Sequence, residues 1–221
     1  MEGSPLSPEI LFQIGPVPIS RSVMTTWVIM GLLAASLTGA FRLAKSGGAF
    51  ATALEILVTT LSRQIEDILG RDPRPFLPLL GSLFIFIVLA NLAAILPGAT
   101  PPTGHIETPA ALALIVFLSV HYFGIRAKGL REYLGHYLEP NPFLLPLNVL
   151  SELTRTFSLM IRLFGNMMSH EFVIAIVVLL AGLLLPIPFL LLGVLIGIIQ
   201  AYIFTVLATV YIGAAVGAVD T

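Results

Sequence analysis

The sequence predicts an all-α polytopic membrane protein with five transmembrane helices, one amphipathic helix at the membrane surface, and a long, strongly tilted hairpin formed by the last two spans. Hydrophobic residues make up 57% of the 221 residues and charged residues only 10%, whereas about a quarter of a soluble domain is charged. The mean hydropathy is +1.00. Apolar stretches of bilayer length recur along the chain. Together these observations exclude the soluble enzyme folds.

The charge balance and the missing residue types exclude further functions. The formal net charge is −1 and no basic run occurs, so we expect no nucleic-acid partner. The chain has no cysteine, which excludes disulfides, thiolate metal sites and a cysteine nucleophile. Neither a Gly-rich phosphate loop nor a His and carboxylate set with metal-ligand spacing occurs. We therefore expect no catalytic site, cofactor or metal in this chain.

Residues 1–21 lack the basic start and apolar run of a cleavable signal, so we expect an external N-terminal segment followed by a span that directs insertion. Five stretches then approach the roughly 20 apolar residues that a helix needs to cross the hydrocarbon core. Pro or charge clusters bound each of them. Within a single membrane domain, they are residues 22–41, 76–96, 110–125, 147–185 and 189–218.

Between the first two spans, residues 49–70 place apolar side chains at helical spacing. Four charged residues lie elsewhere around this helix: Glu55, Arg63, Glu66 and Asp67. The pattern predicts an amphipathic helix at the cytoplasmic membrane surface. A sixth span is the alternative, but it would bury four charges in lipid.

Orientation follows from the basic residues, which concentrate in cytoplasmic loops. With five spans, eight of the eleven Lys and Arg residues lie on one side: Arg42, Lys45, Arg63, Arg71, Arg74, Arg126, Lys128 and Arg131. Residues 97–109 contain neither Lys nor Arg. We therefore expect an external N-terminus and a cytoplasmic C-terminus, consistent with a bacterial inner membrane.

The last two stretches are too long to cross the membrane upright. As single helices, residues 147–185 and 189–218 would be about 58 Å and about 45 Å long, against a hydrocarbon core of about 30 Å. Both must tilt, and the Pro186-Ile187-Pro188 turn would join them in a slanted hairpin. Such a hairpin could lie against the curved surface of a partner protein.

Charged side chains lie inside this apolar hairpin, where each costs roughly 2.5–3.5 kcal/mol. On an ideal helix Arg155, Arg162 and Asn166 fall within about 60° of one another, whereas Glu171 lies about 180° from Arg162. Arg162 stays protonated and offers only a fixed positive charge. In contrast, His170 and Glu171 can take up and release protons.

Structural roles are the alternative for several of these residues. Arg162 could form an ion pair with Glu152 or Glu171 that only stabilises helix packing. For Glu152 and Arg155, three residues apart near the cytoplasmic end, a surface-level helix pair is the expected role.

The remaining polar groups of the spans leave similar choices open. Channel lining and helix packing are equally good readings of His170. We expect Gln200, on the second arm of the hairpin, to hydrogen-bond to Arg162 on the first. Asn91 and His121 are expected to bridge helices or lie at the interface.

Two sequence blocks are specific enough to indicate a family. They are Ser158-Leu-Met-Ile-Arg162-Leu-Phe-Gly-Asn166-Met, followed by Glu171, and Gln200-Ala-Tyr-Ile-Phe-Thr-Val-Leu-Ala-Thr-Val-Tyr211. Together they closely resemble subunit a of F-type ATP synthases. Supporting blocks such as Gly124-Ile-Arg-Ala-Lys-Gly129 extend the resemblance over most of the chain.

The resemblance implies a stator channel, in which two offset aqueous half-channels deliver ions to a carboxylate on each subunit of a rotating c-ring. Arg162 matches the family's essential arginine, whose charge would attract the ring carboxylate and block a direct leak between the half-channels. Glu171 matches the polar position of the external half-channel, and Asn166 and Gln200 match the groups near the arginine.

Other positions carry over from the family as well. His170 stands where the family usually has a small residue, beside the channel glutamate. His105 and Glu107 lie where the family often has a polar residue at the external entrance. Arg155 and Glu152 would lie on the cytoplasmic side, with Arg155 as a second arginine facing the rotor.

The resemblance also implies the partners and leaves the coupling ion open. The partners are the c-ring, b-type peripheral stalk subunits, the soluble ATPase head that the stalks connect, and membrane lipid. Arg155-Thr156 stands where the family commonly has a basic residue and Pro. A compact subunit with an additional arginine is similar to the alternative ATPases of some bacteria, some of which are thought to move sodium. We expect proton coupling, with sodium as the alternative.

Two hypotheses from other functional classes are alternatives to the stator channel. A secondary transporter would use Arg162 to bind an anionic substrate and Glu171 for proton coupling. In a membrane scaffold every polar group would serve packing alone. Copurification with a c-ring, stalk subunits and a soluble ATPase head distinguishes the stator channel from both.

Overall fold

The computed structural model describes residues 10–14, 17–20, 23–32, 35, 49–95, 101–138, 143, 145–182 and 186–217. Within these ranges four helical stretches are long and apolar enough to cross a membrane. They comprise α3 (Leu77–Leu92) with the 3-10 turn η2 (Ala93–Ile95), α4 (Glu107–Lys128), α6 (Leu145–Ala181) and α7 (Pro186–Val216). The chain is thus a helical membrane protein, and these four elements occupy the second to fifth predicted spans.

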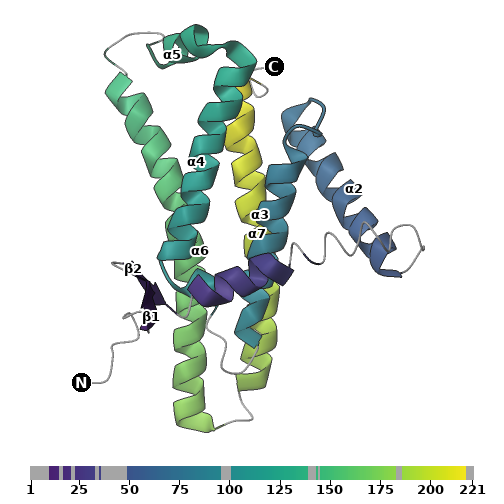
Figure 1. The fold of residues 1–221 in the computed structure, drawn as a ribbon, viewed down its shortest axis with the longest axis vertical. Coiled ribbons are helices and arrows are strands. Elements are labelled where there is room, and N and C mark those ends of the chain that lie inside the picture. Colours follow the sequence, from purple (N-terminus) through teal and green to yellow (C-terminus); the bar gives the residue numbers. More distant parts are fainter. Residues whose placement is uncertain are drawn as a thin grey trace.

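The first predicted span, residues 22–41, is a helix only over Val23–Leu32 in the part that the structure describes. Figure 1 shows this short helix, in purple, running across the long helices rather than beside them. Ile29 packs there with Ala90 and Ala93 at the end of α3. Residues 33–34 and 36–41 lie outside the described residues, so the count of five spans is not confirmed.

The N-terminal segment departs from the all-α prediction. Strands β1 (Ile10–Ile14) and β2 (Val17–Ser20) pair as an antiparallel hairpin. Strands this short carry little periodic signal beside spans of bilayer length. The all-α fold class still holds, because the other elements among the described residues are helices and no helix was predicted in residues 1–21.

The junction between the two long helices also differs from the prediction. Helix α6 stops at Ala181, and Gly182 follows with a φ of 74°, a left-handed conformation that glycine adopts without strain at helix ends. Helix α7 begins at Pro186, since proline is tolerated in the first turn of a helix. The Pro186–Pro188 segment is thus the first turn of α7 and not a turn between helices.

A short helix that the sequence did not predict, α5 (Leu130–Leu138), follows α4. Gly129, with a φ of 83°, ends α4 and separates the two. Tyr133 is buried, and its ring lies so close to Gly124 of α4 that a Cβ at that position would overlap it. The missing side chain at Gly124 therefore seats α5 against α4.

The predicted amphipathic stretch forms helix α2 (Ala49–Leu69), which ends at Gly70. Only its C-terminal half packs closely on the bundle, where Leu61, Ile65 and Leu69 are buried. The side chain of Gln64 donates a hydrogen bond to the Tyr202 hydroxyl of α7. Figure 1 shows the rest of α2 leaning away from the other helices.

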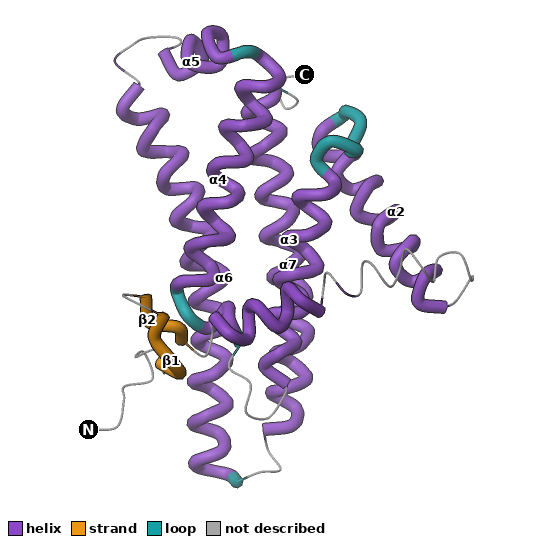
Figure 2. Tube along the Cα trace, in the orientation of Figure 1, coloured by secondary structure: helices purple, strands orange, loops and turns teal. Residues whose placement is uncertain are grey.

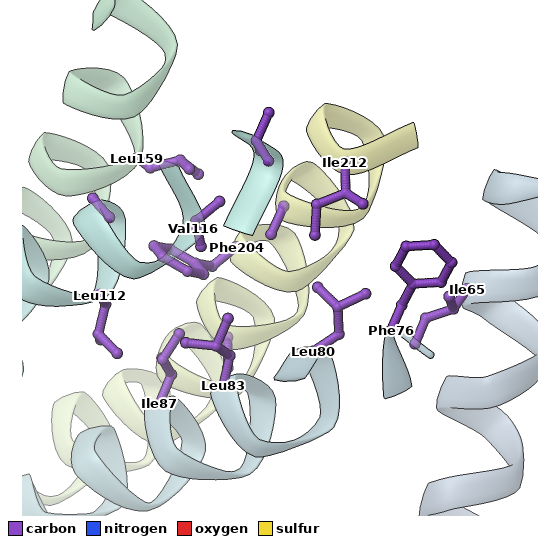
Figure 3. Close-up of a cluster of buried hydrophobic side chains, with 14 of the residues drawn as sticks. Ile65, Phe76, Leu80, Leu83, Ile87, Leu112, Val116, Leu159, Phe204 and Ile212 are labelled. Carbon is purple, nitrogen blue, oxygen red and sulfur yellow. The ribbon is translucent and has the colours of Figure 1, made fainter. Parts of the chain in front are cut away.

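Helix α7 forms the centre of the fold, because it packs against α2, α3, α4 and α6. Figure 3 shows Phe204 and Ile212 of α7 among side chains from these four helices. Small buried residues of α7, such as Ala201 and Ala208, let neighbouring backbones approach closely. The core is therefore one continuous apolar cluster built around α7.

The two long helices extend beyond the others. In Figures 1 and 2 the lower parts of α6 and α7 run as a pair below α3 and α4, and α4 lies between them at the opposite end. At 37 and 31 residues they are about 56 Å and about 46 Å long. Their paired section carries the polar residues described next.

Candidate functional site

A buried amide ties three elements together. Asn91 of α3 donates from Nδ2 to the Gly197 carbonyl oxygen of α7 at 2.9 Å. Its Oδ1 accepts a 2.8 Å hydrogen bond from the Thr103 hydroxyl, in the 3-10 turn η3 (Pro102–Gly104). Asn91 and Thr103 are both buried. Asn91 thus bridges helices, in line with its expected structural role.

A second amide pair joins the arms of the long hairpin. Asn166 of α6 donates from Nδ2 to Gln200 Oε1 of α7 at 2.6 Å. The expected bond between Gln200 and Arg162 is therefore wrong, because Asn166, one turn further along α6, reaches Gln200 instead. The two helices meet at this level through side-chain amides.

Arg162 lies half-buried on α6, one helical turn from both Ser158 and Asn166. Its Nη2 is 3.5 Å from the Ser158 hydroxyl, a distance at which a hydrogen bond is weak. Within the described part of the chain, no carboxylate lies within ion-pair distance of Arg162. The alternative in which Glu152 or Glu171 neutralises this arginine is thus not supported.

Glu171, His105 and His170 form a charged group at the far side of α6 from Arg162. The Glu171 carboxylate interacts electrostatically with both histidines. It also covers Gly104, where an added Cβ would lie 2.9 Å from Glu171 Oε1. The turn after α3 therefore brings His105 to Glu171.

His170 is held by α7. Its Nε2 lies 3.0 Å from the Phe189 carbonyl oxygen, and a Cβ at Gly193 would overlap the imidazole ring. Because a carbonyl only accepts, Nε2 carries the hydrogen and donates it. The missing side chain at Gly193 therefore leaves the space into which the His170 side chain of α6 extends to reach α7.

A second polar region lies at the α5 end of the bundle. A cavity of about 280 Å³ there is lined by residues of α4, α5, α6 and α7, including Tyr133, Asn148, Glu152, Arg155 and Tyr211. We refer to it as the α5-end cavity.

Side chains of the α5-end cavity connect helices. His121 Nδ1 of α4 hydrogen-bonds to the Phe117 carbonyl of its own helix at 2.8 Å and lies 3.9 Å from Glu152 Oε1 of α6. The Arg155 guanidinium lies 5.7 Å from the centre of the Tyr211 ring, within cation–π range. The expected Glu152–Arg155 helix pair is therefore wrong, since each residue turns to a neighbouring helix.

Glu107 is separated from the other predicted entrance residue. It is exposed in the first turn of α4, where the helix dipole favours a negative charge. It lines a largely apolar cavity of about 520 Å³ between the Val23–Leu32 helix, α3 and α4. The structure does not bring Glu107 to Glu171.

The sequence did not reveal which residues leave room for polar side chains instead of supplying charge. Gly193 and Gly197, one turn apart on α7, admit His170 and Asn91 respectively. A small residue every fourth position is a known signal of close helix packing in membranes and could have marked this face. Thr103 carried no such signal, because its partner Asn91 becomes a neighbour only in the fold.

Among the described residues, no group of three or more His, Asp or Glu side chains could hold a metal ion. The chemistry of the site consists of one fixed positive charge, one carboxylate with two histidines, and paired amides. Together with the four long apolar helices, these groups define the class of protein as a polytopic membrane protein with charged and polar side chains between its helices.

Comparison with known proteins makes the family explicit. Residues 23–213 match the family described as ATP synthase A chain. The chain is 61% identical to "ATP synthase subunit a 2" of Bradyrhizobium sp. strain BTAi1, over 99% of both chains. It is 44% identical to "ATP synthase subunit a" of Nitrosospira multiformis, over 95% of this chain and 86% of the relative. The identity is also 44% with "ATP synthase subunit a 2" of Pelobacter propionicus, over 96% and 93%.

The chain therefore belongs to the ATP synthase A chain family, and it is a membrane protein of the ATP synthase membrane sector. The processes of this family are ion transport and ATP synthesis. Membership favours the stator reading over the secondary transporter and the scaffold.

Proposed function

We propose that the chain is the stator channel subunit of a rotary ATP synthase, coupling proton flow to rotation of a c-ring and carrying no catalytic site of its own. The observation that carries the proposal is Arg162, a permanent charge on a membrane-spanning helix with no acidic partner among the described residues. Such a charge costs several kcal/mol in the membrane. A carboxylate on another subunit supplies the missing partner.

The surroundings of Arg162 fit a surface that meets another protein or lipid. Ile161, the residue before it on α6, is 42% exposed, and Phe157, one turn before Ile161, is 60% exposed. An apolar face around one unpaired charge suits a ring whose outer surface is apolar except for one carboxylate per subunit. The charge attracts that carboxylate when it is ionised and repels a cation that would pass directly between the half-channels.

Two polar regions supply the half-channels. The group of His105, His170 and Glu171 lies on the side of the bundle that carries η3, and we assign it to the external half-channel. The α5-end cavity, with Glu152 and Arg155, is assigned to the cytoplasmic half-channel. Arg162 lies between the two along α6, so ions that use both must travel with the ring.

The distribution of basic residues supports this orientation. Arg71 and Arg74 follow α2, and Arg126, Lys128 and Arg131 lie at the junction of α4 with α5. Figure 1 places α5, the end of α2 and the end of α7 at one end of the bundle. Since basic loops remain in the cytoplasm, we assign that end to the cytoplasm of a bacterial cell and the N-terminus to the outside.

The arginine provides the first test. We expect Arg162→Ala to abolish ATP synthesis driven by an ion gradient, while the complex still assembles. One charge crossing 100 mV carries about 2.3 kcal/mol, and a leak past an absent arginine would dissipate it. The measurement is synthesis by membrane vesicles, with assembly followed by copurification of the c-ring, stalk subunits and ATPase head.

The matched control is Arg126→Ala, which removes an exposed arginine that bonds only to Tyr122 on its own helix. This variant should synthesise ATP at the unmodified rate. Full coupled synthesis by the Arg162→Ala complex would refute the role of the fixed charge. Purification of the native chain as a lone transporter would refute the stator assignment altogether.

The coupling ion is tested in liposomes that contain the whole complex, with ATP-driven pumping measured from trace to millimolar sodium. We expect acidification that is independent of sodium and is collapsed by a protonophore. Sodium uptake that persists with the protonophore would show sodium coupling. In that case the same residues would line a hydrated sodium path.

A further inference from the structure

A very small chamber lies between α3, α6 and α7, at the level where the two long helices meet. Its volume is about 10 Å³, and its polar lining consists of Asn91, Asn166, His170 and Gln200, with Gly193 and Gly197 among its other walls. A space of roughly 10–15 Å³ by this measure holds one water molecule. The chamber is thus about the size that one water molecule needs.

Two residues that line the chamber each have a buried polar atom with no hydrogen-bond partner among the described residues: Gln200 Nε2 and His170 Nδ1. Gln200 is 3% exposed, and its Oε1 already accepts from Asn166. An unpaired buried polar group costs about 1–3 kcal/mol. A molecule that satisfies both atoms therefore stabilises this site.

The chemistry of the two atoms is complementary. The Gln200 amide nitrogen can only donate. His170 Nε2 donates to the Phe189 carbonyl oxygen, which leaves Nδ1 of the neutral ring as an acceptor. One water can accept from Gln200 and donate to His170 at the same time. No side chain of the chamber makes this connection directly.

We propose that this chamber is a binding site for a single ordered water that joins His170 Nδ1 to Gln200 Nε2. The water connects the titratable group of His105, His170 and Glu171 to the amide pair beside Arg162. It also fixes the neutral tautomer of His170, with the hydrogen on Nε2. A proton that His170 takes up then goes to Nδ1, on the chamber side.

This role deepens the proposed function, in which His170 belongs to the external half-channel. His170 acts here as a positioning residue, since it is held by α7 through Phe189 and by the water through Gln200. Its protonation turns Nδ1 into a donor, so the water must reorient. The state of the histidine is thereby transmitted to the amides next to the fixed charge.

The test is a cryo-EM structure of the intact complex at a resolution that shows ordered water. We expect one peak within hydrogen-bond distance of both Gln200 Nε2 and His170 Nδ1. Gln200→Met should remove that peak, since it deletes the donor at similar volume. The control, Thr205→Val, should retain it, because the Thr205 hydroxyl bonds within α7 to Ala201.

A second measurement does not depend on the variants. Nitrogen NMR of histidine-labelled complex in lipid should show His170 with Nε2 protonated and Nδ1 accepting a hydrogen bond. A map with no peak, a direct contact between Gln200 and His170, or a proton on Nδ1 of the neutral ring would each overturn the water site. Pumping by the same wild-type sample tests the channel role separately, because a complex with the water but no pumping would contradict only that role.

Discussion

At the scale of single residues, a missing side chain at Gly193 decides where the protonatable His170 ring can lie. The imidazole occupies the space that a Cβ would fill, and this position allows its bond to the Phe189 carbonyl. Arg162, in contrast, contributes a charge, and no carboxylate among the described residues pairs with it. The site therefore depends equally on residues that provide charge and on residues that provide space.

We predict that Gly193→Ala displaces the His170 ring and lowers ATP-driven ion pumping about fivefold while the complex assembles normally. The lost hydrogen bond is worth about 1 kcal/mol, and about 1.4 kcal/mol corresponds to tenfold in rate. Pumping by the reconstituted complex is the measurement.

Gly81→Ala is the matched control, because an added Cβ there meets no atom within 4 Å. Its pumping should equal that of the unmodified complex. An unchanged rate in Gly193→Ala would show that the position of His170 does not limit transport.

At the scale of elements, the turn η3 is positioned by a single polar link. Thr103 donates to Asn91, and Asn91 donates to the backbone of α7, so one side chain connects η3, α3 and α7. This link places Gly104 and His105 against Glu171. The group of His105, His170 and Glu171 is therefore assembled by an interaction outside the hairpin that carries its carboxylate.

We predict that Thr103→Val destabilises the subunit by about 1–3 kcal/mol, because Asn91 Oδ1 is left buried without its donor. The measurement is the temperature at which the subunit is lost from the purified complex, which should fall. Pumping should fall as well, since His105 is no longer held at Glu171.

Ser82→Ala serves as the control for that experiment. The Ser82 hydroxyl is exposed on α3 and bonds only to the Leu79 carbonyl of the same helix. Its removal should leave the release temperature unchanged. An unchanged temperature in Thr103→Val would mean that the Asn91 link does not hold η3.

At the scale of the whole molecule, the distribution of Arg and Lys supports the proposed orientation. The junctions after α2 and after α4 carry Arg and Lys, while the described residues between α3 and α4 carry none. The absence of cysteine in the chain makes the two ends separately addressable by single substitutions.

We predict that Ile187→Cys reacts with a membrane-impermeant maleimide in intact cells, whereas Arg131→Cys reacts only after permeabilisation. Both side chains are exposed, Ile187 at the start of α7 and Arg131 in α5. Labelling of the isolated subunit by gel shift is the measurement. The reverse pattern would invert the proposed orientation and exchange the two half-channels.

Much of the helical architecture was predictable because bilayer length imposes long apolar runs. The amphipathic helix at residues 49–70 and the spans beginning near residues 76, 110, 147 and 189 were all visible in the sequence, to within a few residues at most ends. Helix α5 and the β-hairpin were not, since both segments are too short to show a clear hydrophobic period. The first span was predicted at full length, whereas the described helix covers Val23–Leu32 alone.

The sequence alone determined the chemistry that this protein can use, namely one permanent charge at Arg162, a carboxylate at Glu171 and histidines beside it, because residue type dictates ionisation. Which of these groups meet was decided only by the tertiary structure. Gln200 reaches Asn166 and not Arg162, Arg155 turns to Tyr211 and not Glu152, and His105 joins Glu171 while Glu107 does not. The reason is physical, because a helix places its own residues by rotation, but partners on other helices are chosen by packing, and packing at this site depends on glycines that carry no chemistry of their own.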